Sequence, residues 1–328
     1  MKHSDKLSIR DGATGHAART ANPKRVKAKP QPARPTPQIG RLVELNGFGD
    51  DPGKLRMLAH LPQAAAGRPL VILLHGCAQD AAVFAGDTGW TDLADRLRFP
   101  LILPDQAEIN MSGRCFDWYR ESDTARDAGE AGSIASMTRA AVSHFKSDPE
   151  RVFILGLSAG GAMTAALLAA YPDLFAAGAS VAGVPVGAAQ SGMQAIMQMR
   201  TGGPDQSPEE WAGRVRAAAP EGFAGSWPRL SIWQGQADTT VAPENGDLLA
   251  MQWCALHGLT GPGAIEQVGN GIEHRTWPDR RRPLVEHWSL PNLPHAYPID
   301  ERAVVPGRFV QQAPVDATAN IARFFELD

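Results

Sequence analysis

A strand–turn–helix pattern near the middle of the chain, at residues 151–163, places the strongest limit on the fold. The apolar run Val152–Leu155 enters the turn Gly156-Leu-Ser-Ala-Gly160, and an alanine-rich stretch of helical character leaves it. In a G-x-S-x-G turn of this kind the serine backbone is strained, and glycine avoids collisions two positions away on either side. The pattern predicts that Ser158 presents its hydroxyl at the apex, beside amides at the N-terminus of a helix.

Apolar runs of strand length recur on both sides of this turn and alternate with helical patterns. Continuous apolar runs are typical of strands that are buried on both faces of a parallel sheet. Their alternation with helices predicts an α/β fold with a mainly parallel sheet covered by helices on both faces. A short strand at 55–62 opens the series, a helix at 316–325 closes it, and the apolar runs are 69–74, 99–103, 152–155, 176–181 and 230–235.

The first 40 residues differ in composition from the rest of the chain. They hold nine Lys and Arg against two Asp, five prolines and almost no large apolar residues, which is typical of a disordered segment. We therefore expect a basic, proline-rich, disordered segment at 1–40 and one catalytic domain at 41–328. Because the whole chain has a net charge of −3 and this segment carries +7, the domain carries −10 and is a poor candidate for nucleic-acid binding.

Targeting signals are weak in this sequence. The N-terminal segment lacks the apolar core of a secretory signal, and no apolar stretch is long enough to cross a membrane. The three cysteines are an odd number and have no metal-binding spacing. We therefore expect a cytoplasmic protein without membrane association. The sequence does not indicate an oligomeric state.

Two regions without strand patterns lie in positions where they can form a binding site. At 187–227 the pattern predicts a small helical insertion, with helices at 193–199 and 208–218, over the carboxyl ends of the strands. The polar loop 110–126 carries Trp118 and Tyr119, and loops of this length in compact domains are usually functional. The two aromatic side chains either line a pocket or seal the loop onto the sheet.

A serine nucleophile needs a base, and the base needs a carboxylate that orients it. In α/β-hydrolases, where the G-x-S-x-G turn occurs, the order along the chain is Ser, then Asp or Glu, then His. A predicted buried strand ends at Gly235, and Asp238 follows three residues later. This position places Asp238 at the edge of the sheet where strand ends converge. The other aspartates that we considered lie in helices or peripheral loops: Asp173, Asp205, Asp247 and Asp279.

The candidate base is His295, in a proline-rich loop after the last strand of the series. An imidazole in that loop can reach both Asp238 and Ser158. His257 lies in a predicted helix, and His274 and His287 lie inside predicted strands.

The apolar run 69–74 ends in His75-Gly76-Cys77. A strand that ends in this way before a loop supplies the second oxyanion amide in hydrolases of this architecture, and the candidate donor is the backbone N–H of Cys77. We expect His75 to be structural and to bond its own loop.

Four groups of residues carry a combined pattern. They are Leu74-His-Gly-Cys-Ala-Gln79 with Phe84-Ala85, Thr88 and Trp90; Cys115-Phe-Asp-Trp-Tyr119; Arg126 with Gly129-Glu-Ala-Gly-Ser-Ile134; and Gly156-Leu-Ser-Ala-Gly-Gly-Ala-Met163. Together they resemble the poly(3-hydroxybutyrate) depolymerase family of esterases, and the resemblance extends over about 47–326. The sequence departs from the usual family motifs at Pro294-His-Ala-Tyr297 and at Cys115-Phe-Asp-Trp-Tyr119.

The resemblance implies an α/β-hydrolase that cleaves carboxylic esters through an acyl-enzyme, without a cofactor or metal. It implies Ser158 as nucleophile, Asp238 as the acid, His295 as base, and the amides of Cys77 and Ala159 as oxyanion donors. The main substrate expectation is poly(3-hydroxybutyrate) or related polyester chains and oligomers. Feruloyl or acetylxylan esters are the alternative, because the same broad family contains both kinds of esterase. A binding protein that retains the fold but has no turnover is the alternative from another class.

The resemblance also implies a disulfide between Cys77 and Cys115, if the fold brings their loops together in an oxidising environment. Cys254, in a predicted helix, is then left as a free, buried thiol.

Overall fold

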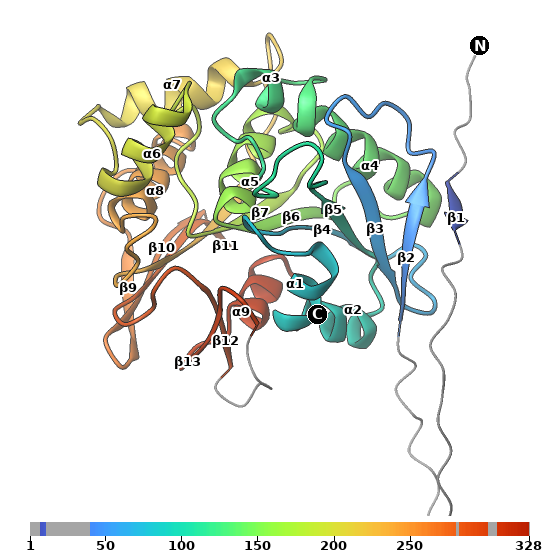
Figure 1. Cartoon of the computed structure of the whole chain (residues 1–328). Coiled ribbons are helices and arrows are strands. Elements are labelled where there is room, and N and C mark those ends of the chain that lie inside the picture. The colour runs from blue at the N-terminus through green and yellow to red at the C-terminus, as the bar shows by residue number, and fades with distance from the viewer. Residues whose placement is uncertain (1–6, 11–39, 280–281, 301–306, 328) are drawn as a thin grey trace, which may run out of the picture.

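The computed structural model describes residues 7–10, 40–279, 282–300 and 307–327. Within these residues an eleven-stranded sheet runs through the molecule in the order β1-β2-β3-β5-β4-β6-β7-β8-β11-β10-β9 (Figure 1). Its six central strands are parallel, and most of their residues are buried, as the apolar runs predicted for five of the six. They are β5 (Leu101–Asp105), β4 (Leu70–Leu74), β6 (Val152–Leu157), β7 (Ala177–Val181), β8 (Arg229–Gly235) and β11 (Arg282–Leu290).

The strands outside this centre are antiparallel to their neighbours. On one side lie β3 (Arg56–Leu61), β2 (Arg41–Asn46) and β1 (Ser8–Arg10), and on the other β10 (Ile272–Asp279) and β9 (Ala264–Gly269). A separate two-stranded parallel sheet pairs β12 (Tyr297–Asp300) with β13 (Val310–Ala313). The apolar pattern did not predict β1, β2, β9 or either strand of the small sheet.

The prediction that 1–40 is disordered is wrong for Ser8–Arg10. These residues pair in antiparallel register with Glu44–Asn46 of β2, and Leu7 packs against the core. An edge strand offers unpaired backbone N–H and C=O groups, so it can order a segment that has no apolar pattern of its own. Apart from residues 7–10 and Gly40, the rest of the 1–40 segment lies outside the described residues.

Helices cover both faces of the sheet, as predicted (Figure 1). Apolar residues of α4 (Gly129–Phe145), α5 (Ala159–Ala170), α7 (Pro208–Ala218) and α8 (Glu244–Leu256) join one hydrophobic cluster with one face of the strands. Those of α1 (Ala81–Asp87), α2 (Trp90–Leu97) and α9 (Ala317–Phe324) join a second cluster on the other face.

The predicted insertion at 187–227 forms two helices, α6 (Gly192–Thr201) and α7. The side chain of Ser207 caps α7, Pro208 occupies its first turn, and Glu210 completes the capping box by accepting from the Ser207 backbone N–H at 2.8 Å. Trp211 and Val215 of α7 are fully buried where this helix packs on α5 and α8. The insertion is therefore an integral layer of the domain.

In the part of the chain that is described, no helix has the length and apolar character needed to cross a membrane.

Candidate active site

The turn between β6 and α5 has the strained geometry that the G-x-S-x-G pattern predicts. Ser158 has a φ of 58° and a ψ of −118°, in a region that L residues rarely occupy. A Cβ on Gly156 would strike the backbone of Gly160, and one on Gly160 would lie 2.5 Å from the carbonyl oxygen of Leu74. Glycine at both positions therefore lets the turn pack against the end of β4. The Ser158 N–H donates to the carbonyl oxygen of Val181 at 2.8 Å, which fixes the apex.

Three predicted residues form one chain of hydrogen bonds. His295 Nδ1 lies 2.7 Å from Asp238 Oδ2, and His295 Nε2 lies 2.9 Å from Ser158 Oγ. Because a carboxylate only accepts, Nδ1 carries the proton, and Nε2 is left to accept the hydrogen of the serine hydroxyl. This arrangement can take a proton from Ser158 and hold the resulting imidazolium beside a negative charge.

Asp238 is held on two sides in a tight turn after β8. Its Oδ1 accepts from the backbone N–H groups of Thr240 and Val241, both at 2.8 Å, and its side chain is fully buried. The amide of Gln234 donates to the Val241 carbonyl at 3.0 Å and closes the turn. These contacts leave Oδ2 directed at His295.

The loop that carries His295 is fastened to the end of β8 and to the core. The Ala237 N–H donates to the Leu293 carbonyl at 3.2 Å, and a Cβ on Gly235 would strike that same carbonyl. Tyr297 is fully buried, with its hydroxyl 3.0 Å from Trp90 Nε1 and 2.9 Å from Thr318 Oγ1. Tyr297, which departs from the usual family motif, therefore belongs to the core beneath the site.

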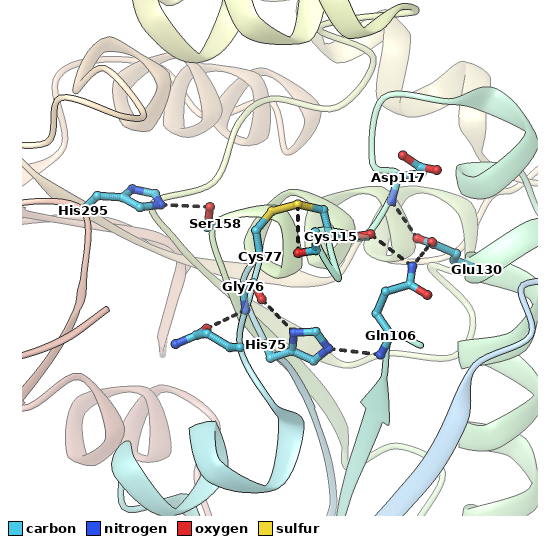
Figure 2. The surroundings of a disulfide bond; sticks show 11 residues. His75, Gly76, Cys77, Gln106, Cys115, Asp117, Glu130, Ser158 and His295 are labelled. Atoms are coloured by element: carbon cyan, nitrogen blue, oxygen red, sulfur yellow. Dashed lines mark hydrogen bonds between the residues drawn. A yellow bond between two sulfur atoms is a disulfide. The ribbon is translucent and has the colours of Figure 1, made fainter. Parts of the chain in front are cut away.

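The loop after β4 lies against the serine turn, because a Cβ on Gly76 would be 3.4 Å from the Leu157 carbonyl. A disulfide joins Cys77 of this loop to Cys115, as the resemblance implied, and Cys254 is free and buried (Figure 2). Within the described residues, neither the Cys77 amide nor the Ala159 amide donates a hydrogen bond. Both amides remain able to donate to a further group.

His75 is structural, as predicted. Its Nδ1 lies 2.7 Å from the Gly76 carbonyl, and its Nε2 accepts from the Gln106 N–H at 3.1 Å. This pairing requires a neutral ring with the proton on Nδ1. Burial lowers the pKa of His75, which agrees with the neutral form.

A cavity of about 970 Å³ lies between the 110–126 loop and the helical insertion. Trp118 and Tyr119 both line it, which favours the first of the two roles left open for them. Ala162 also lines it and is one helical turn from Ser158, whose carbonyl accepts the Ala162 N–H at 2.9 Å. Sequence reasoning did not identify two further lining residues, Gln198 and Arg214, which lie on the insertion where no motif marks them.

The histidines that were set aside have other partners. His274 Nε2 lies 2.9 Å from Glu286 Oε2, and His257 Nε2 lies 3.2 Å from the Pro228 carbonyl. Burial lowers the pKa of His287 to about 4. Among the described residues no group of three or more His, Cys, Asp or Glu side chains is arranged to hold a metal ion.

The family described as esterase PHB depolymerase matches residues 55–275, about two thirds of the chain. The chain belongs to this family. It is 34% identical over 291 residues to poly(3-hydroxyalkanoate) depolymerase C of Paucimonas lemoignei, covering 87% of this chain and 70% of that protein. It is 35% identical over 257 residues to an acetylxylan esterase of Coprinopsis cinerea, covering 73% and 68%. Family membership shows a carboxylic ester hydrolase.

A solved acetyl xylan esterase from Aspergillus awamori has a similar fold. It superposes with a TM-score of 0.75 at 26% identity and covers 88% of this chain and all of that one. The α/β-hydrolase fold predicted for this chain is thus confirmed.

The predicted cytoplasmic location is wrong. Relatives of this chain in the family are secreted, extracellular esterases and depolymerases. The prediction relied on the missing signal pattern and on the odd number of cysteines. Two of those cysteines are joined in a disulfide, a bond that persists in oxidising compartments.

Proposed function

We propose that Ser158, His295 and Asp238 are the nucleophile, the base and the orienting acid of the ester hydrolase. The observation that carries this proposal is the continuous hydrogen-bond chain from Asp238 through His295 to Ser158 at the strained turn. The same chain argues against a binding protein without turnover, because every part needed to activate the hydroxyl is present.

In the proposed reaction, His295 Nε2 takes the hydroxyl proton as Ser158 Oγ attacks the ester carbonyl carbon. The amides of Cys77 and Ala159 donate to the oxyanion of the tetrahedral intermediate. Collapse of this intermediate breaks the bond to the alcohol oxygen, which leaves with the proton from His295. A water molecule then attacks the acyl-enzyme by the same route and releases the acid.

Asp238 contributes by orientation and charge. Two backbone N–H groups hold its Oδ1, and its Oδ2 keeps the proton of His295 on Nδ1. The imidazolium that forms during each proton transfer then lies 2.7 Å from a buried negative charge.

The substrate proposed first is a polyhydroxyalkanoate chain or oligomer. Similarity to a poly(3-hydroxyalkanoate) depolymerase extends over 87% of the chain, and the cavity has room for several acyl units beside Trp118 and Met197. The second candidate is an acetylxylan or feruloyl ester. The fold similarity to an acetyl xylan esterase favours this alternative.

A substrate panel tests both parts of the proposal. Purified protein is given hydroxybutyrate oligomers, acetylated xylan and feruloyl esters, and product release is compared with that of Ser158→Ala. The favoured outcome is oligomer hydrolysis that Ser158→Ala abolishes. Preferential release of acetate from xylan would establish the second substrate class, and equal activity of the Ser158→Ala variant would refute the assigned nucleophile.

A further inference from the structure

The proposed oxyanion donor Cys77 is covalently tied to a second loop. The disulfide links it to Cys115, at the start of the segment that carries Trp118 (Figure 2). The Ala78 N–H also donates to the Gly113 carbonyl at 2.7 Å. The position of the Cys77 amide therefore depends on what holds the Cys115 loop.

A buried carboxyl group on α4 holds that loop. Glu130 Oε2 accepts from the backbone N–H of Asp117 at 2.8 Å, and Oε1 accepts from the side-chain amide of Gln106. The same Gln106 nitrogen donates to the carbonyl of Cys115 at 3.1 Å. Figure 2 shows this path from Glu130 through Gln106 to the disulfide. Glu130 is 4% exposed, so water does not replace these partners.

The hydrogen-bond pattern favours a carboxylate at Glu130. Two N–H groups converge on its two oxygens, and protonation would turn one of these oxygens into a hydroxyl group, which accepts more weakly. Burial opposes the charge and raises the pKa of Glu130 to about 8. The nearby carboxylates of Asp117 and Asp123 act in the same direction, whereas the two N–H donors act against it. The group therefore changes charge near neutral pH.

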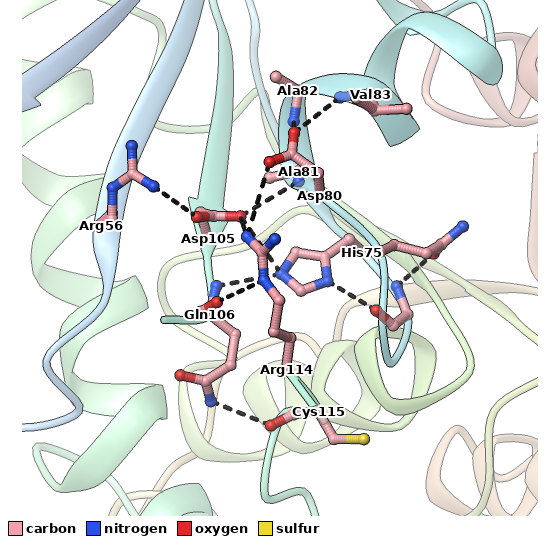
Figure 3. Close-up of polar contacts among 12 residues, drawn as sticks. Arg56, His75, Asp80, Ala81, Ala82, Val83, Asp105, Gln106, Arg114 and Cys115 are labelled. Atoms are coloured by element: carbon pink, nitrogen blue, oxygen red, sulfur yellow. Dashed lines mark hydrogen bonds and ion pairs between the residues drawn. The ribbon is translucent and has the colours of Figure 1, made fainter. Parts of the chain in front are cut away.

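A separate clamp holds the other ends of both loops. Asp105 is buried and accepts from Arg114 at 2.7 Å, from Arg56 at 3.2 Å and from the Ala81 N–H at 3.2 Å (Figure 3). Arg114 directly precedes Cys115, and Ala81 begins the helix after the Cys77 loop. Beyond Arg114, the Cys115 loop is held by Glu130 and Gln106.

We infer that Glu130 is a positioning residue that, as a carboxylate, aligns the Cys77 amide with the oxyanion through Gln106, the Cys115 loop and the disulfide. This inference rests on the proposed function, because it takes Cys77 as an oxyanion donor. Glu130 touches no reacting atom. Its effect is transmitted entirely through the two bonded loops.

Glu130→Gln tests the inference, because it keeps the shape and removes one of the two acceptors. On a short-chain alkyl ester at about pH 9, kcat and kcat/KM should fall together by about tenfold, as for one lost hydrogen bond, while KM stays within about twofold. At about pH 6 the difference from wild type should largely vanish, because Glu130 is then protonated. Labelling of Ser158 with a fluorophosphonate counts the folded active sites in each sample.

The matched control is Glu108→Gln, which changes an exposed carboxylate in the same loop region. It should match wild type at both pH values. A rise in KM with unchanged kcat in Glu130→Gln, or a loss that is equal at both pH values, would overturn the inference.

A double-variant cycle tests the route through the disulfide. Cys77→Ala with Cys115→Ala removes the covalent link, so adding Glu130→Gln to that pair should cost less than about twofold in kcat. A further loss equal to that in the disulfide-containing protein would show that Glu130 acts elsewhere and overturn the inference. Failure of the proposed function gives a distinct result, in which Ser158→Ala hydrolyses the ester as fast as wild type.

Discussion

At the residue scale, the placement of Ser158, Asp238 and His295 was predictable because each follows a strand of the sheet. The ends of parallel strands converge, so position relative to a strand is enough to select one Asp and one His among several. The contacts that hold them were not predictable. Gln234 and Glu130 lie inside ordinary strand and helix patterns, and only the folded chain shows what their side chains meet. Glu130 is part of a family motif, but the motif does not indicate what its carboxyl group contacts.

Two single variants and their combination test whether Ser158 and His295 act as a unit. Ser158→Ala and His295→Ala should each lower kcat by at least about a thousandfold, because formation of the acyl-enzyme needs both the nucleophile and its base. The double variant should be no more than a few times slower than either single variant. Circular dichroism checks that each remains folded. Losses that multiply in the double variant would contradict a shared role.

The charge of Glu130 also predicts how stability depends on pH. Its pKa is raised from 4.5 to about 8 in the folded protein, so between these pH values the folded state binds more protons than the unfolded state. The free energy of unfolding must then fall as pH rises through this window. Relative to Glu130→Gln, wild type should lose stability between about pH 5 and pH 8 in urea titrations. A difference that is constant over this range would show that Glu130 ionises normally.

At the element scale, prediction succeeded where both faces of an element are buried and failed at the edges. The central strands β4 and β6 are continuous apolar runs because helices cover them on both sides. In contrast, β9 is exposed at every position, so its residues show neither an apolar run nor alternation. β1 is a strand only because β2 offers it a pairing edge. These strands depend on long-range pairing, which a local pattern does not contain.

The helical insertion provides a test of local sequence signals. Ser207→Ala removes the side-chain acceptor of the α7 capping box and should lower the free energy of unfolding by about 1 kcal/mol. Ser207→Asp, which keeps an acceptor at the same place, should remain close to wild type. Both values come from urea or thermal unfolding. If the two variants lose stability equally, the cap is not what stabilises this helix.

At the scale of the whole molecule, the elements on the two faces of the sheet support different parts of the candidate site. The α1, α2 and α9 side buries Tyr297 and supports the His295 loop from below. The other side carries the 110–126 loop and the insertion, with the cavity between them. Three exposed apolar residues of α6, namely Met193, Ile196 and Met197, share one helix face, and Met197 also lines the cavity. If this cavity takes the substrate, as proposed, a chain must enter between the 110–126 loop and the insertion.

This arrangement predicts how the physical form of a polyester affects its hydrolysis. A polyester chain that enters the cavity must first separate from the neighbouring polyester chains. The free energy of this separation is zero for a soluble oligomer and largest for a chain packed in a crystal. Soluble hydroxybutyrate trimer should therefore be cleaved fastest, amorphous polymer more slowly, and crystalline film negligibly. Monomer release is measured for the three forms at equal ester content, with Ser158→Ala as the blank. Release from crystalline film at the rate of the trimer would mean that the polymer is attacked at its surface without extraction of single chains.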